Sequence, residues 1–170
     1  MQNLEIAIKN KRLVDFNLFN GNVTYTGICL IANKRILVIV NFDLKGKEFN
    51  GFTIFKNQDF DTFEIWKQKF VDIKKNNLIE FKNKYKIEKL NTFYSWLKLI
   101  KNNQVVAVFI ENNHSEYFVG QIESINLRTI TMKLIDKSGN WINEKEFKIS
   151  EINYFSFDSK YERKLQKRIK

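Results

Sequence analysis

Short runs of alternating apolar and polar residues fill most of the chain outside residues 62–101. Such runs, bounded by polar or glycine-containing turns, predict β-strands. Asn20-Gly21 separates DFNLF from NVTYT, which predicts a tight hairpin. The polar stretch 111–116 occupies the matching place between VVAVFI and YFVGQI. Later glycine turns at 45–47 and 138–140 complete a prediction of about five short strands in each half.

The two halves can be laid over each other, which indicates an internal repeat. At an offset of 93 residues, the matching pairs are Gly27 and Gly120, Asn33 and Asn126, Arg35 and Arg128, Asp43 and Asp136, and Gly46 and Gly139. At an offset of 95, they are Phe52 and Phe147, Ile54 and Ile149, Phe60 and Phe155, Trp66 and Tyr161, and Phe70 and Leu165. The alternative is two unrelated β segments of similar composition. We favour a duplication.

Helical spacing is found at the chain start, in the middle and at the chain end. Residues 3–11 predict a short helix, and apolar residues three and four apart from Phe63 onward predict helix over 62–101. A separate helix is expected over 91–101, with Asn91 as a candidate N-cap. Each half therefore ends in a helical pattern.

These patterns predict a mainly β fold with helices (α+β). Because the strands are short and the turns tight, we expect two tandem five-stranded small barrels joined by a helical connector. The expected domains are a first barrel with a short N-terminal helix at 1–66, the basic connector at 67–101, and a second barrel with a C-terminal helix at 102–170.

The segment GQIESINLRTITMKLID, from Gly120, resembles the first signature of the Sm-like small barrels, as does its counterpart in the first half. The resemblance implies a five-stranded, strongly bent barrel. It implies no RNA-binding residues here, because Asn126 stands where the family has an aspartate and Ile130 where it has an asparagine. The end of the second copy also resembles uncharacterised small proteins of bacteria with low-G+C genomes.

The outward positions of the two copies differ in polarity. In the second copy they carry Gln121, Glu123, Thr129, Thr131 and Lys133, which is typical of a strand with one face in water. In the first copy they carry Ile28, Leu30, Ile36, Val38 and Val40, an apolar face that needs a cover. The helices of 62–101 are one candidate cover, and a partner protein or a second copy of the chain is the other.

The net charge of +10 is concentrated in two places. Residues 67–101 carry ten lysines and three acids, and residues 158–170 carry six basic residues and two acids. An A+T-rich genome also enriches lysine, so the basicity has a compositional explanation. If it is functional, the partner is anionic. The candidate nucleic-acid contacts are Lys67, Lys74, Lys75, Lys82, Lys86, Arg163, Lys167 and Arg168.

Few residues suit catalysis or metal binding. The one cysteine, Cys29, lies in a strand pattern, and the one histidine, His114, lies in a polar turn. A nucleophile beside a base, a zinc ligand set and a glycine-rich phosphate loop are not found in the sequence. We therefore expect no enzyme activity, no metal and no cofactor. A single cysteine, and no apolar run long enough to span a bilayer, favour a cytoplasmic protein.

Two functions follow as hypotheses. The first is a non-catalytic protein that holds a nucleic-acid backbone on its basic helical surface. The alternative is a protein–protein module, such as an immunity protein, inhibitor or adaptor, that uses the apolar outer face of the first copy, with a homodimer as one form of that interface. Salt dependence separates them, because only phosphate contacts weaken steeply as salt rises.

Overall fold

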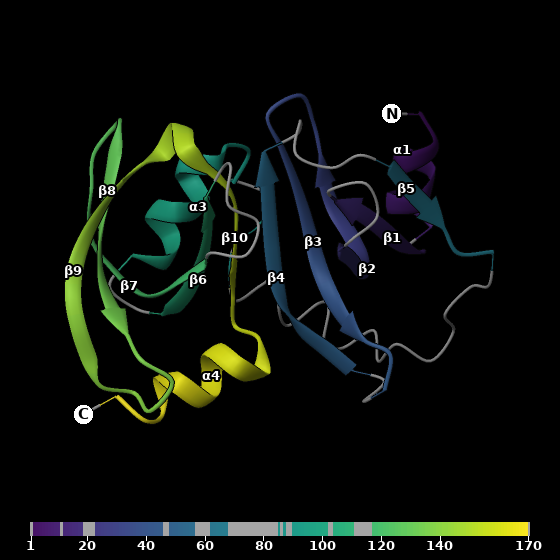
Figure 1. The fold of residues 1–170 in the computed structure, drawn as a ribbon. Coiled ribbons are helices and arrows are strands. Elements are labelled where there is room, and N and C mark those ends of the chain that lie inside the picture. The colour runs from purple at the N-terminus through teal and green to yellow at the C-terminus, as the bar shows by residue number, and fades with distance from the viewer. Residues whose placement is uncertain are drawn as a thin grey trace. The chain divides into compact units, whose positions relative to one another are not determined.

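A computed structural model describes residues 2–10, 12–18, 23–45, 48–56, 62–67, 85, 87, 90–101, 104–110 and 117–169. The first half contains α1 (Gln2–Lys9), β1 (Leu13–Leu18), β2 (Val23–Ala32), β3 (Ile36–Asp43), β4 (Glu48–Lys56) and β5 (Thr62–Ile65) (Figure 1). The second contains α3 (Phe93–Ile100), β6 (Val105–Ile110), β7 (Tyr117–Ile125), β8 (Thr129–Ile135), β9 (Trp141–Lys148), η2 (Ile149–Glu151), β10 (Ile152–Phe157) and α4 (Lys160–Gln166).

The strands form one open antiparallel sheet of ten, in the order β5-β1-β2-β3-β4-β10-β6-β7-β8-β9. The prediction of two tandem five-stranded barrels is therefore wrong. A barrel closes only when the strands at the two ends of its order pair with each other. Among the described strands, β5 is not a neighbour of β4, and β10 is not a neighbour of β9. Strand patterns predict the strands themselves, but they do not specify which partner an outer strand takes.

The chain divides into two compact units. The first contains Met1–Asn50 and Ile54–Phe93, and the second contains Gly51–Thr53 and Tyr94–Lys170. The helix α3, which the sequence placed with the connector, thus belongs to the second unit from Tyr94 onward. No helix in the described part of the chain is both long and apolar enough to cross a membrane.

In the first unit, β3 is buried on both faces. All five residues from Ile36 to Val40 are inaccessible to solvent, so inner and outer positions alike lie in a core. The helix α1 contacts β2 and buries Leu4 and Ala7. Tyr85 and Ile87, from the range predicted as connector, are buried as well. The burial predicted for the outer positions of this copy is confirmed for all but Leu30, which is half-buried.

In the second unit, β8 alternates as predicted. Ile130, Met132 and Leu134 are buried, whereas Thr129 and Lys133 are partly exposed. The aromatic core of this unit is formed by Phe52, Trp96 and Phe157, whose rings lie 5.1–6.2 Å apart. The predicted difference between the two copies is confirmed for these strands, because the matching positions of β3 have no exposed surface. The predicted exposure of the polar positions is confirmed only for Glu123, since Gln121, Thr129, Thr131 and Lys133 are half-buried.

The two halves pair their strands in the same register. In the first unit, Gly27 pairs with Asn41, and in the second Gly120 pairs with Leu134, both 93 residues later. The pairing register shifts between Cys29 and Ile31 in the first unit, and it shifts at the equivalent place, between Ile122 and Ser124, in the second. The turn residues agree too, since Asn33 and Asn126 each accept hydrogen bonds from backbone N–H groups two and three residues on, at 2.8–3.1 Å. The predicted offset of 93 is therefore confirmed for these strands.

The predicted offset fails at the last strand of each half. Phe16 pairs with Phe63, and the equivalent Val108 pairs with Phe155, so the two phenylalanines are 92 residues apart rather than 95. The match of Trp66 with Tyr161 is consequently wrong. The helix predicted from residue 62 is also wrong for Thr62–Ile65, which form β5, because pairing with β1 outweighs a helical spacing that involves few residues. The helices predicted at 3–11 and 91–101 are confirmed in α1 and α3.

Candidate nucleic-acid interface

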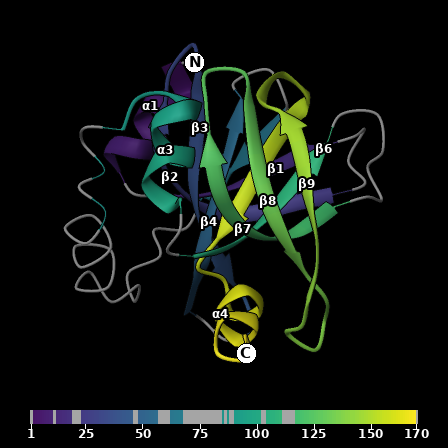
Figure 2. The same cartoon turned by 90° about the vertical axis from the view of Figure 1, so that its left-hand side faces the viewer.

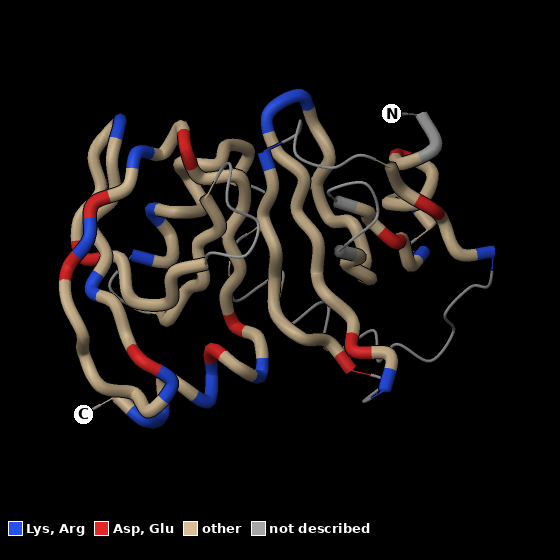
Figure 3. Tube along the Cα trace, in the orientation of Figure 1, with Lys and Arg blue, Asp and Glu red and all other residues tan. Residues whose placement is uncertain are grey.

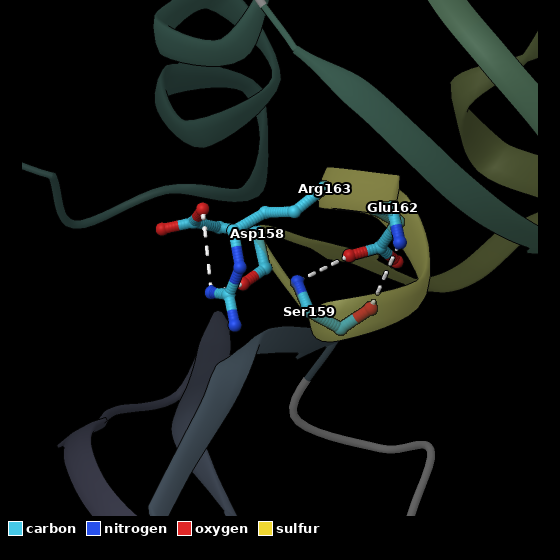
Figure 4. A network of polar contacts seen from close by, with 4 residues as sticks. All are labelled: Asp158, Ser159, Glu162 and Arg163. Atoms are coloured by element: carbon cyan, nitrogen blue, oxygen red, sulfur yellow. Dashed lines mark hydrogen bonds and ion pairs between the residues drawn. The ribbon is translucent and has the colours of Figure 1, made fainter. Parts of the chain in front are cut away.

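The basic end of the chain is organised by α4, which begins at a well-formed N-cap. The Ser159 hydroxyl accepts a hydrogen bond from the Glu162 backbone N–H at 3.3 Å. The Glu162 carboxylate accepts one from the Ser159 backbone N–H at 2.7 Å (Figure 4). This reciprocal arrangement is a capping box, which satisfies N–H groups that a helix start otherwise leaves unpaired. It fixes where α4 starts and therefore where its basic residues lie.

Glu162 is buried although it is a carboxylate. Its side chain also accepts a hydrogen bond from the Ser156 hydroxyl at 2.5 Å, which links α4 to β10. Burial raises the pKa of Glu162 above its ordinary value, and the hydrogen bonds from Ser156 and Ser159 oppose that shift. The acid is thus turned inward and adds little negative charge to the surface of the helix.

Arg163 is held within the chain. Its guanidinium donates a hydrogen bond to the Asp158 carbonyl and lies 3.6 Å from the Asp158 carboxylate (Figure 4). Asp158 itself adopts a φ of 61°, a left-handed conformation that turns the chain from β10 into α4. Arg163, one of the predicted nucleic-acid contacts, therefore stabilises this turn.

The end of α4 is tied to the turn between β8 and β9. The Arg168 guanidinium donates to the Lys137 carbonyl at 3.2 Å. Gly139 of that turn has a φ of 91°, and a Cβ atom there would lie 2.7 Å from Cβ of Arg168. Figure 2 shows the β8–β9 turn beside α4, at one end of the strands of this unit. Residues 31 positions apart in sequence thus meet on one surface.

Four cations are exposed on this surface, and we call them the basic cluster. They are Lys137, Lys164, Lys167 and Arg168. Figure 3 shows lysine and arginine positions gathering where α4 meets the β8–β9 turn. In the described part of the chain, the three lysines form no ion pair or hydrogen bond through their side chains.

The carboxylates nearest in sequence are engaged elsewhere. Asp136 accepts hydrogen bonds from Ser138 and Asn140 within its own turn, at 2.8–3.1 Å, and the bonds from Asn140 contribute most to lowering its pKa. Asp158 pairs with Arg163, and Glu162 is buried. Asp136 keeps its negative charge beside Lys137, but the four cations of the basic cluster still outnumber the acids that face solvent there, which suits the binding of an anion.

The predicted basic contacts do not all lie together. Lys167 and Arg168 are in the basic cluster, and Lys67 is exposed in the first unit. Lys74, Lys75, Lys82 and Lys86 lie outside the described residues. Sequence reasoning missed Lys137 and Lys164. The basic run at the chain end indicated Lys164, but nothing in the sequence indicated that the turn at Lys137 would meet α4.

The predicted protein-interface residues are not a free surface. Ile28, Ile36, Val38 and Val40 are buried in the chain, and Leu30 is half-buried. A partner could reach them only by displacing what covers them.

A second polar site lies on the first unit. Asp15 of β1 accepts a hydrogen bond from the Thr26 hydroxyl at 2.6 Å and one from the Trp66 indole N–H at 2.9 Å. A shallow pocket beside it is lined by Asp15, Glu64, Ile65, Trp66 and Lys67. Asp15 and Glu64 are directly opposite each other on β1 and β5. The sequence indicated Lys67 as a nucleic-acid contact and Trp66 as a repeat position, but no pattern in it indicated Asp15 or Glu64.

Groups for other chemistry are sparse. Burial raises the pKa of the Cys29 thiol to about 12, so this cysteine is protonated at neutral pH and is a poor nucleophile. Among the described residues, no three histidine, cysteine, aspartate or glutamate side chains are grouped so that they could hold a metal ion. His114 lies outside the described residues.

The chain matches no family model, and comparison with curated proteins and with solved structures finds no similar protein. The resemblance to Sm-like barrels stays a prediction.

Proposed function

We propose that this protein is a non-catalytic binding protein that holds a nucleic-acid backbone on the basic cluster of its second unit. The observation that carries the proposal is the exposure of Lys137, Lys164, Lys167 and Arg168 on one surface, while Asp158 is paired with Arg163 and Glu162 is buried. Lysines added by genome composition alone would be scattered among acids. Phosphate groups are the abundant anions that such a surface attracts without recognising a sequence.

The contacts expected are to phosphates rather than to bases. Lysine side chains on a short helix and a turn act as separate point charges, which neutralise phosphates and confer little sequence preference. We expect micromolar or weaker affinity at physiological salt, and a steep loss as salt is added. Lys74, Lys75, Lys82 and Lys86 remain candidate contacts that lie outside the described residues.

The test is an anisotropy titration with generic duplex and single strands at two salt concentrations. The variant K164E/K167E reverses two charges of the basic cluster. The control K9E/K98E reverses two exposed lysines in the last turns of α1 and α3, so net charge and helix-end electrostatics change equally. Loss of binding in the first variant alone supports the proposal. Equal loss in both, or no binding at low salt, contradicts it and leaves a protein partner as the better hypothesis.

A further inference from the structure

A ladder of aromatic rings crosses three strands of the second unit. Tyr154 of β10 is opposite Phe109 of β6, which is opposite Tyr117 of β7. The Phe109 ring stacks on Tyr154 at 4.2 Å and on Tyr117 at 5.4 Å, with interplanar angles of 16° and 24°. Cross-strand aromatic pairs stabilise sheets, so a structural role explains the buried part of this ladder.

The outer part of the ladder is not explained by packing. Tyr154 is buried, but Tyr117 is 47% exposed. Tyr161 is 41% exposed and lies one helical turn before Leu165, which belongs to the apolar cluster that Phe109, the stacking neighbour of Tyr117, packs against. Burial is the main cause that raises the pKa of Tyr161, and the Tyr117 phenol adds to the shift. Two tyrosines from different elements thus share a surface that is open to solvent.

This surface continues into the basic cluster. Phe109 packs against the apolar cluster that includes Ala107 of β6 and Leu165 of α4. Tyr161 and Lys164 are three residues apart on α4, so they lie on neighbouring parts of one helix face. Proteins that bind single-stranded nucleic acids combine exposed aromatic rings with neighbouring cations. Unpaired bases stack on the rings, and phosphates contact the cations.

We infer that Tyr117 and Tyr161 form a stacking surface for the unpaired bases of a single-stranded nucleic acid whose phosphates lie on the basic cluster. This inference rests on the proposed function and narrows it from any nucleic acid to single strands. Bases of a duplex are already stacked on one another and cannot use these rings. A protein partner would also gain contact area from the tyrosines, but it would need acidic side chains placed opposite the cations, whereas every nucleic-acid strand carries a phosphate at each nucleotide.

The experiment compares a 12-nucleotide single strand with a duplex of the same length. Each is titrated against the native chain, Tyr117→Ala, Tyr161→Ala, Tyr117→Phe and the control Leu127→Ala, whose side chain is 85% exposed on the same unit. Each alanine variant should weaken single-strand binding about 5- to 150-fold and leave duplex binding unchanged. Tyr117→Phe and Leu127→Ala should bind as the native chain does. A 2-aminopurine base in the strand should lose fluorescence on binding to the native chain, and less so with the alanine variants.

The outcomes separate the two proposals. If K164E/K167E abolishes binding but both tyrosine variants bind single strands normally, the inference is wrong and the proposed function stands. If Tyr117→Ala weakens duplex and single strand equally, the rings are not a stacking surface and the inference is again wrong. Single strands of oligo(dT) and oligo(rU) are titrated separately to identify the preferred sugar. Tighter binding of either strand than of the duplex supports the inference. If neither strand binds at low salt, both proposals fail. Circular dichroism checks that each variant is folded.

Discussion

Equivalent positions on the outer faces of the two units carry opposite chemistry. Strand pairing makes Asp15 and Thr26 of the first unit equivalent to Ala107 and Val119 of the second. In the first unit the pair is joined by a hydrogen bond beside an open pocket. In the second it forms part of an apolar cluster with Leu165 of α4. One arrangement of strands thus supports two kinds of surface. The positions covered by α4 carry apolar residues, and the equivalent positions beside the pocket carry polar ones.

The largest effect should come where the two units are alike. A Cβ atom at Gly27 would collide with the Val40 carbonyl, and one at Gly120 with the Lys133 carbonyl. Because backbone cannot yield as a side chain can, Gly27→Ala and Gly120→Ala should each cost about 3 kcal/mol or more in the free energy of unfolding. Urea denaturation measures this cost, with Gln121→Ala as control. If only one unit is sensitive, the two are not equivalent at this position.

The next largest loss of stability should come from a substitution in α4, the helix that covers one face of the second unit. Leu165 is 1% exposed and packs on the cluster that contains Val105 and Val119. Leu165→Ala should cost about 2–5 kcal/mol, since it removes buried apolar contacts and leaves a cavity. The exposed neighbour variant Lys164→Ala should change the free energy of unfolding by no more than about 0.5 kcal/mol. Equal effects of the two variants would show that α4 is not a cover.

Exchanging the chemistry of Thr26 and Val119 should produce unequal losses. Val119→Thr places a hydroxyl in an apolar cluster and should cost about 1–3 kcal/mol. Thr26→Val removes the 2.6 Å hydrogen bond to Asp15 at a partly buried site and should cost about 0.5–1.5 kcal/mol. Thermal unfolding of both variants measures the difference. A larger loss in Thr26→Val would contradict the contrast between a covered and an open face.

The smallest expected effect is a pH dependence that comes from Glu162 of the second unit. Because the folded pKa of Glu162 is raised above 4.5, the folded state holds its proton more tightly than the unfolded chain. Stability from this group is therefore greatest below pH 4.5 and falls as pH rises through the folded pKa. Glu162→Gln keeps a side chain suited to the capping box and should flatten this decline. Unfolding measured across that pH range would contradict the account if the native chain and the variant declined equally.

Features set by local sequence pattern could be predicted from the sequence, whereas features set by tertiary contacts could not. Alternation and turn residues predicted most strands, and the register at Gly27 and Gly120 followed from one offset. The spacing of Phe63 and Trp66 predicted a helix, but Thr62–Ile65 form a strand. The spacing along the sequence carries no information about the pairing with β1 that forms this strand. Two residues of the basic cluster, Lys167 and Arg168, were predicted because they lie in one charged run of the sequence. Lys137 was not predicted, because only folding brings the β8–β9 turn beside them.

The salt dependence of nucleic-acid binding tests the central claim most directly. Each phosphate neutralised on a duplex contributes about 0.9 to the slope of log affinity against log salt. With Lys137, Lys164, Lys167 and Arg168 engaged, the slope should be about 3–4 in magnitude. K164E/K167E should lower it by about 2, and K9E/K98E should leave it unchanged. A slope near zero, or an equal change in the two variants, would contradict the assignment of the basic cluster as the binding surface.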